Sequence, residues 1–277
     1  MGKKIIAPSI GLLAIFCLAG NAGAETTNLK TTTGNELGLT VSHYVYREPE
    51  ISLSLKATKF GIDYNGSLAL HNGWFLRGDL RFAIGEADYS SSPSGNKNGN
   101  PDWYYEVRGL VGKDFQVRNH GYSPYVGLGY RYLFNDLRGL TSNGSAGYRR
   151  ESNYYYLPVG VTHRLQLRPQ ARLVSNVEYD YLLRGRQESQ LSDLGDGQFF
   201  TGASDVTNKQ TRGYGLRLGV MYEMSRWSAG PYLTYWRISQ SNNADTFLLH
   251  NGVTIAVPVF EPRNNTVEAG VKASYKF

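Results

Sequence analysis

The sequence predicts an all-β protein: an antiparallel up-and-down β-barrel of about ten strands that crosses a membrane. Three observations carry this prediction. Runs of roughly ten residues alternate between apolar and polar side chains, the connections between runs alternate between short and long, and no helical periodicity is found beyond residue 36. A barrel in a bilayer needs this alternation, because one face of each strand meets lipid and the other faces the lumen.

The clearest alternating run covers residues 74–84, WFLRGDLRFAI. Its large apolar side chains fall on one face of a strand, and Arg77, Asp79 and Arg81 fall on the other. Ten runs of this kind are expected at about 37–47, 53–70, 74–86, 103–116, 123–135, 153–166, 171–184, 211–224, 226–239 and 264–277. Counts of eight and twelve strands remain open as alternatives.

Short and long connections alternate along the chain, so that the short ones fall at one end of the barrel and the long ones at the other. Short turns are expected at 71–73, 117–122, 167–170 and near Ser225, and long polar loops at 85–101, 136–152, 185–210 and 240–263. An even number of strands returns both termini to the short-turn end, which we expect to be periplasmic. A soluble β-sandwich is the alternative, but it has no reason to sort its loops by length.

The N-terminus has the pattern of a cleaved secretory signal. Lys3 and Lys4 precede an apolar stretch, and Ala22-Gly23-Ala24 supplies a cleavage site. We therefore expect a signal peptide at 1–24, a short periplasmic segment at 25–36 and a barrel domain at 37–277. The stretch is too interrupted for a transmembrane anchor. The one cysteine, Cys17, falls in the leader, so no disulfide is expected in the exported chain.

Composition excludes several classes of protein. The mean hydropathy of −0.39 argues against a helical membrane protein. The net charge is +6, but basic and acidic residues are interleaved, so we expect no nucleic-acid binding. Tyrosines and tryptophans should form two girdles at the membrane surfaces, one near the long loops and one near the short turns.

Strand parity assigns a set of charged side chains to the lumen. These are Arg77, Asp79, Arg81, Glu106, Arg108, Arg131, Glu178, Asp180, Arg217, Glu268 and Lys272, together with Asp63, Arg164 and Glu223. The set holds seven charges of each sign, and ten strands leave only a narrow interior. We expect these charges to pair as a structural plug. A narrow polar pore that selects solutes is the alternative.

No catalytic constellation is apparent. The five histidines do not accompany a nucleophile or paired acids at usable spacing, and Glu178 and Asp180 are expected to be ion-pair partners rather than an acid pair. No cluster with metal-ligand spacing is found, so no metal or other cofactor is expected. The sequence therefore favours a protein that is not an enzyme.

Several segments together resemble the small outer-membrane β-barrel proteins of Gram-negative bacteria. They are the leader, PYVGLGYRYLF, YYYLPVGV and the aromatic ending VEAGVKASYKF. The resemblance implies a monomer in the cell outer membrane, in contact with its lipids and lipopolysaccharide. It also implies that Val271, Ala273, Tyr275 and Phe277 form a signal for the outer-membrane assembly machinery.

The sequence leaves three functions open. The first is a non-enzymatic barrel, either structural or a narrow porin. The second is an adhesin or ligand-binding barrel that acts through its long loops, where a host or surface ligand would bind. The third is a hydrolase at the rim, like the omptin proteases or the lipid-cleaving barrels. In the loops, Arg138, Arg149 and Arg150 are expected near the lipid headgroups of the outer leaflet. The sequence identifies no solute or ligand.

Overall fold

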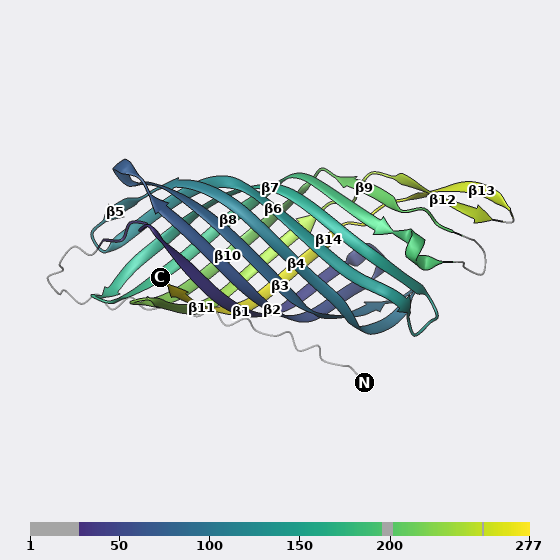
Figure 1. Ribbon diagram of the computed structural model, residues 1–277, viewed down its shortest axis with the longest axis horizontal. Helices are drawn as coiled ribbons and strands as arrows, with labels where there is room; N and C mark the ends of the chain where they lie inside the picture. The colour runs from purple at the N-terminus through teal and green to yellow at the C-terminus, as the bar shows by residue number, and fades with distance from the viewer. Residues whose placement is uncertain (1–27, 196–201, 251) are drawn as a thin grey trace, which may run out of the picture.

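Ten antiparallel strands form one closed barrel in the computed structural model, which describes residues 28–195, 202–250 and 252–277 (Figure 1). The barrel strands are β1 (Gly34–Glu48), β2 (Leu53–Ala69), β3 (Trp74–Ser91), β4 (Gly95–Lys113), β6 (His120–Leu140), β7 (Ala146–Arg168), β8 (Ala171–Gln190), β10 (Gly213–Met224), β11 (Trp227–Ile238) and β14 (Asn264–Lys276). Antiparallel pairing of β14 with β1 closes the barrel, which leaves no free edge in lipid. The prediction of a ten-stranded antiparallel barrel is confirmed.

Burial along β3 shows how the alternation builds the wall. Trp74, Leu80 and Ile84 point outward and are nearly half exposed, whereas Asp79 and Ala83 point inward and are buried. Successive side chains of a strand point to opposite faces, so the polar positions of this run are forced into the lumen. Among the described residues, no helix is long and apolar enough to span a membrane.

The prediction of long loops at 85–101 and 136–152 is wrong. β3 and β4 continue until only residues 92–94 separate them, and β6 and β7 continue until only 141–145 remain. Gly185–Ser189, expected in a loop, belongs to β8. The outward faces of these strand extensions are mostly polar because the extensions project beyond the lipid, where the outer face of a paired strand needs no apolar side chains.

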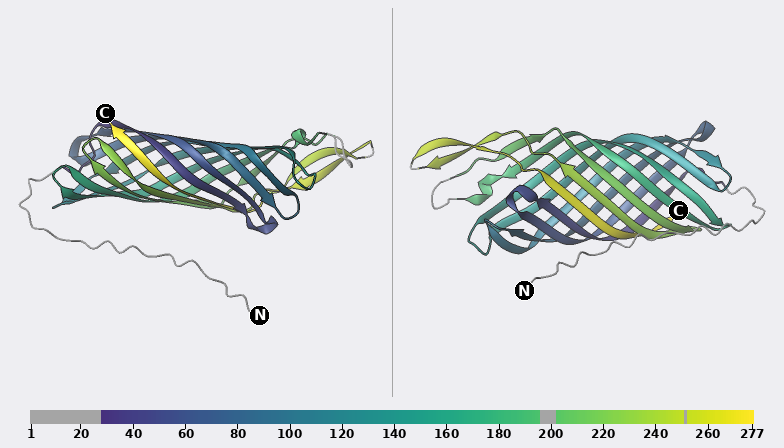
Figure 2. Two further views of the ribbon diagram at one scale, coloured as in Figure 1. Left: turned by 90° about the horizontal axis from the view of Figure 1, so that it is seen from below. Right: turned by 180° about the vertical axis from the view of Figure 1, so that it is seen from behind.

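The same end carries further elements. β9 (Val206–Gln210) pairs with the outer half of β8, while β10 pairs with its other half. β12 (Ala244–His250) and β13 (Val253–Val259) form a hairpin that projects past the barrel rim (Figure 2). Two short 3-10 turns, η1 (Pro49–Ile51) and η3 (Leu191–Leu194), complete this end, which we call the hairpin end.

The opposite end has tight turns and is called the short-turn end. η2 (His71–Gly73) joins β2 to β3, with Asn72 at φ 56°, and β5 (Phe115–Val117) extends the pairing along β6. The C-terminus lies here, where the backbone amides of Asn35 and Phe277 each donate to the other residue's carbonyl. The expected signal peptide at 1–24 lies outside the described residues.

Candidate functional site

The middle of the lumen is filled by ion pairs centred on Arg217. Its Nε lies 2.7 Å from Asp180 Oδ2 and 3.1 Å from Glu178 Oε1, and its Nη1 lies 2.8 Å from Glu106 Oε2. Arg131 Nε lies 3.2 Å from Glu106 Oε1 on the other side. These five side chains come from four strands and are buried, so they cross-link the barrel wall through its centre.

A second group of ion pairs continues toward the short-turn end. Arg108 binds Asp79 and Glu178 at 2.6 Å each, and Arg77 Nε lies 3.0 Å from Asp79 Oδ1. Glu178 is shared with Arg217, so the two groups form one connected network.

A third group, formed by Asp63, Arg81, Glu268 and Lys272, lies on and beside β14. Arg81 lies 3.3 Å from Asp63 and 3.7 Å from Glu268, and Lys272 lies 3.5 Å from Asp63. Glu268 also accepts hydrogen bonds from Ser42, Tyr104 and Tyr232. The structure thus brings all eleven candidate lumen charges together inside the barrel.

Aromatic rings fill the space that the ion pairs leave. Trp236, Tyr156 and Tyr104 are almost fully buried, and the Arg131 guanidinium carbon lies 4.9 Å from the Tyr104 ring centre and 5.5 Å from that of Trp236. A Cβ added at Gly129 would fall 2.3 Å from the Tyr156 ring. Inward-facing glycines therefore make room for aromatic rings. We call this ion-paired and aromatic layer the plug.

Parity reasoning missed some buried charges nearer the hairpin end. Lys59 is fully buried and paired with Asp102, and its Nζ lies 4.6 Å from the Tyr44 ring centre. Lys59 lies four residues before Asp63 on β2, so its side chain points to the same, inward face. The alternation of β2 could therefore have identified Lys59 as a lumen charge. Asp102 was missed because it directly precedes the predicted start of its strand.

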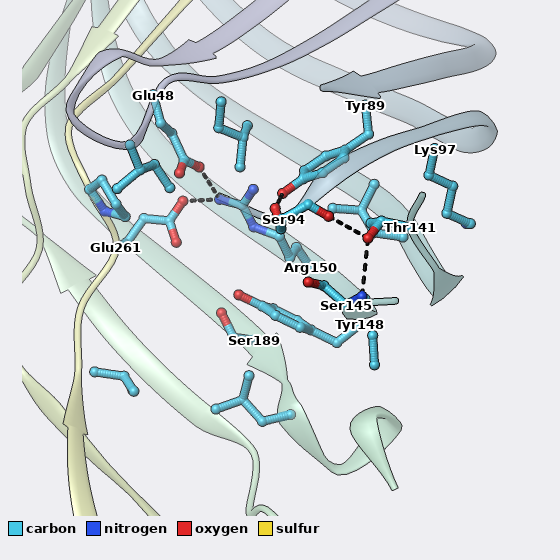
Figure 3. Close-up of a pocket in the computed structure, with 18 of the residues that line it drawn as sticks. Glu48, Tyr89, Ser94, Lys97, Thr141, Ser145, Tyr148, Arg150, Ser189 and Glu261 are labelled. Atoms are coloured by element: carbon cyan, nitrogen blue, oxygen red, sulfur yellow. Dashed lines mark hydrogen bonds and ion pairs between the residues drawn. The ribbon is translucent and has the colours of Figure 1, made fainter. Parts of the chain in front are cut away.

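A cup of about 300 Å³ opens above the plug at the hairpin end (Figure 3). Its walls come from the extensions of β3, β4, β6 and β7 and from the segment after β13. Its apolar lining is Ile51, Leu53, Leu137, Leu191, Val206, Val259, Phe260 and Pro262, with Tyr89 and Tyr148. A concave, mostly apolar site with a few convergent polar groups is the usual form of a small-molecule site.

Two carboxylates and one guanidinium form the floor of the cup. Arg150 Nη2 lies 2.8 Å from Glu48 Oε1 and also contacts Glu261, and the Tyr46 hydroxyl lies within hydrogen-bond distance of each carboxylate. Arg150 was expected at the membrane surface with Arg138 and Arg149, and this prediction is wrong for Arg150. Because β7 extends further than predicted, Arg150 occupies an inward-facing position of the strand and its side chain is buried.

Glu261 is held in place by the backbone around it. Its backbone amide donates to Ser241 Oγ at 2.8 Å. Burial raises the pKa of the Glu261 carboxyl to about 7, with Arg150 acting to lower it and Glu48 to raise it. Near neutral pH this carboxyl therefore changes between a protonated and a charged form.

The paired acids and the described histidine side chains considered for catalysis lie in different parts of the barrel. Glu178 and Asp180 lie in the plug and bind Arg108 and Arg217. His43 points outward from β1, and His120 stacks on His163 outside the barrel, with 5.3 Å between ring centres. Within 28–195, 202–250 and 252–277 no group of His, Cys, Asp and Glu side chains has the arrangement of a metal site.

The outside of the barrel carries the surface that a bilayer requires. Large apolar side chains are exposed around it, among them Leu39, Phe60, Leu80, Leu128, Val177, Leu218 and Val271. Aromatic rings gather on both sides of this band, as in the stack of Trp103, Tyr105 and Tyr132 and the pair of Trp227 and Tyr275. Apolar surface of this extent on a closed barrel belongs in lipid.

No protein-family model matches the sequence, and a search of curated proteins finds no match. Solved structures are similar in fold. The outer membrane protease OmpT from Escherichia coli is 12% identical at a TM-score of 0.54, over 91% of this chain and 100% of that one. This chain has the fold of an outer-membrane β-barrel protein. The apolar exterior agrees with this placement in the outer membrane.

Two more solved barrels resemble the chain less closely in shape. The transport unit of the autotransporter AIDA-I from Escherichia coli is 10% identical, with a TM-score of 0.46 over 91% of this chain and 93% of that one. A major outer membrane protein from Thermus thermophilus is 12% identical, with a TM-score of 0.37 over 88% of this chain and 99% of that one.

Val271, Ala273 and Tyr275 of the expected assembly signal lie on the lipid face of β14, and Phe277 directly follows the strand. Val271 and Phe277 are exposed, Ala273 points outward, and Tyr275 packs on Trp227. Their recognition by the assembly machinery stays a prediction.

Proposed function

We propose that this outer-membrane barrel is non-conducting and non-enzymatic, and that it binds a small cationic ligand in the cup at its hairpin end. In this proposal the plug stabilises the barrel and closes its lumen. The hairpin end faces the cell exterior. The observation that carries the proposal is the cup floor, where two buried carboxylates share one guanidinium beneath apolar walls.

Charge at the floor sets the chemistry of the ligand. With both Glu48 and Glu261 ionised, Arg150 balances only one of them. The pKa of Glu261 is raised mainly by its burial and further by the charge of Glu48. Lys97, the other cation in the cup, lies on the far side and donates to Asn100 Oδ1 (Figure 3). A ligand ammonium can replace the proton at Glu261 while its apolar body packs on Leu53 and Phe260.

The architecture supports a binding role over catalysis or transport. Polar groups in the cup are engaged in holding its walls: Tyr89 shares a hydrogen bond with Ser94, and Thr141 Oγ1 accepts from the Ser145 amide. No histidine belongs to the cup lining among the described residues. Below the floor, the lumen holds the buried side chains of the plug, which supports a closed barrel.

Benzylamine should bind the wild-type protein in neutral detergent more tightly than benzoate, which has the same ring and the opposite charge. Glu261→Gln should weaken benzylamine binding by about tenfold or more, because a charge-assisted hydrogen bond contributes about 1.5–3 kcal/mol. Isothermal titration at fixed ionic strength measures both effects. Glu188→Gln, in an ion pair at the exposed rim, is the matched control and should change nothing. Equal binding of benzoate would contradict the proposal.

Benzylamine affinity should also depend on pH. The ligand remains a cation across the tested range, whereas Glu261 loses its proton around pH 7 when the cup is empty. Binding to the ionised carboxylate therefore strengthens as pH rises from about 6 to about 8 and levels off above that. The Glu261→Gln variant should give a flat profile over the same range. A wild-type profile that falls with pH would show that the ligand does not contact this carboxylate.

A further inference from the structure

A second cavity, of about 500 Å³, opens into the lumen at the short-turn end, on the other side of the plug from the cup. We call it the vestibule. Its lining is unbalanced in charge, with ten basic side chains against three acidic ones. The basic ones include Arg108, Arg164, Arg172, Arg217 and Lys276, and the acidic ones include Glu223.

Several of these cations are bound from behind by carboxylates of the plug. Arg108, for example, binds Asp79 and Glu178, and Arg217 binds Glu106 and Asp180. The plug carboxylates thus lie behind the guanidinium groups that face the vestibule. A cleft lined by one sign of charge, with low-dielectric walls, attracts ions of the opposite sign.

Arg164 on β7 is weakly neutralised compared with these arginines. Its carboxylate partner is Asp114, and their closest approach is 3.8 Å. Asp114 already accepts hydrogen bonds from the Thr31 amide at 2.8 Å, from the Thr31 hydroxyl at 3.1 Å and from Ser123. Arg164 itself donates to the hydroxyls of Ser123 and Thr31. Its charge is therefore held by hydroxyl groups and a distant carboxylate.

The neighbours of Arg164 add positive charge. Arg172 on β8 lies near enough to repel it, as does Arg77. Arg172 and Lys276 share a single carboxylate, Glu223, which both contact. The Nε of Arg172 is buried and has no hydrogen-bond acceptor among the described residues. In this corner of the vestibule, Arg164, Arg172 and Lys276 thus face two carboxylates.

We propose that the vestibule binds a soluble oxyanion of the phosphate class between Arg164 and Arg172. A tetrahedral oxyanion supplies the missing negative charge and several acceptor oxygens, and guanidinium groups bind such anions in a two-pronged geometry. The hydroxyl of Thr32, which also lines the cavity, can add a donor. The cavity lies inside the barrel wall, so the occupant is a soluble anion rather than a headgroup of the surrounding lipid.

The test uses inorganic pyrophosphate as the probe and the full exported chain refolded in neutral detergent. Isothermal titration at fixed ionic strength, with chloride as the balancing anion, should give saturable binding at one site. Arg164→Gln should weaken that binding by about tenfold or more, because it removes a charge-assisted contact. Arg138→Gln is the matched control: it removes an exposed guanidinium paired with Asp136 at the hairpin end and should leave binding unchanged.

Two results would overturn the proposal: no saturable binding by the wild-type protein, or equal binding by wild type and Arg164→Gln. Heat-modifiable gel migration shows whether each variant is folded. Arg172→Gln carries the same expectation and replaces Arg164→Gln if that variant does not fold. Because the vestibule and the cup lie at opposite ends of the lumen, benzylamine binding should be the same in all these variants.

Discussion

Arg217→Ala is expected to lower the free energy of unfolding by about 3–5 kcal/mol, because breaking a buried ion pair leaves uncompensated charge. Arg217 contacts Glu106, Glu178 and Asp180, all of which are buried. The substitution therefore leaves three carboxylates around the space that the guanidinium filled. Urea unfolding in detergent, followed by gel migration and tryptophan fluorescence, measures the loss.

Arg138→Ala is the control for that measurement. Its side chain is half exposed and pairs with Asp136 at the rim, so its removal should leave the stability almost unchanged, as is usual for exposed ion pairs. Arg217→Lys keeps one positive charge but loses the planar set of donors that reaches three carboxylates, and its stability should fall between those of wild type and Arg217→Ala. If Arg217→Ala were as stable as Arg138→Ala, the ion-paired plug would not hold the barrel together.

The double variant Arg131→Ala/Trp236→Ala should make the barrel conduct ions. Arg131 lies over the Trp236 ring, and both are almost fully buried between the vestibule and the cup. Their removal takes away a guanidinium and the largest ring of the plug, and water can enter a space lined by Glu106 and Arg217. Planar-bilayer recordings should show steady openings that the wild-type protein lacks.

The interpretation of those recordings depends on a folded barrel. Trp→Ala in a packed core costs about 3–5 kcal/mol, so gel migration must first show that the double variant is assembled. Leu39→Ala on the lipid face is the control, because it removes an exposed side chain far from the lumen, and it should remain silent. A folded double variant that also stays silent would mean that other side chains close the lumen on their own.

The strands and their facing were predictable because the bilayer imposes a strict pattern. In the lipid-embedded part of β3, Leu80 must face lipid and Asp79 the lumen, so alternation alone assigns both. Outside the lipid this constraint is lost. Ser90 and Asn96 pair in a ladder although their segment has the composition of a loop. Backbone pairing continues there without an apolar outward face, and the composition of the segment does not reveal it.

The plug was more predictable than the cup floor, because the alternating pattern holds only in the lipid-embedded part of the strands. The alternation of side chains along each strand identified the charges of the plug. Their partners, such as Glu178 for Arg108, depend on which strands approach one another inside the barrel. The cup floor was missed. Glu48 and Arg150 lie in extensions beyond the lipid, and Glu261 lies in a connection, so no periodicity links the three. Their meeting is set by the tertiary structure of the hairpin end.

Planar-bilayer recording of the wild-type protein is the most direct test of the central claim, that the lumen is closed by its own paired charges. The protein should be inserted from detergent after gel migration has shown it to be folded, and recorded at several ionic strengths and voltages. We expect no steady openings under any of these conditions, because the plug of Glu106, Arg131 and Arg217 spans the lumen. Steady openings of uniform size from the folded wild-type protein would contradict the account.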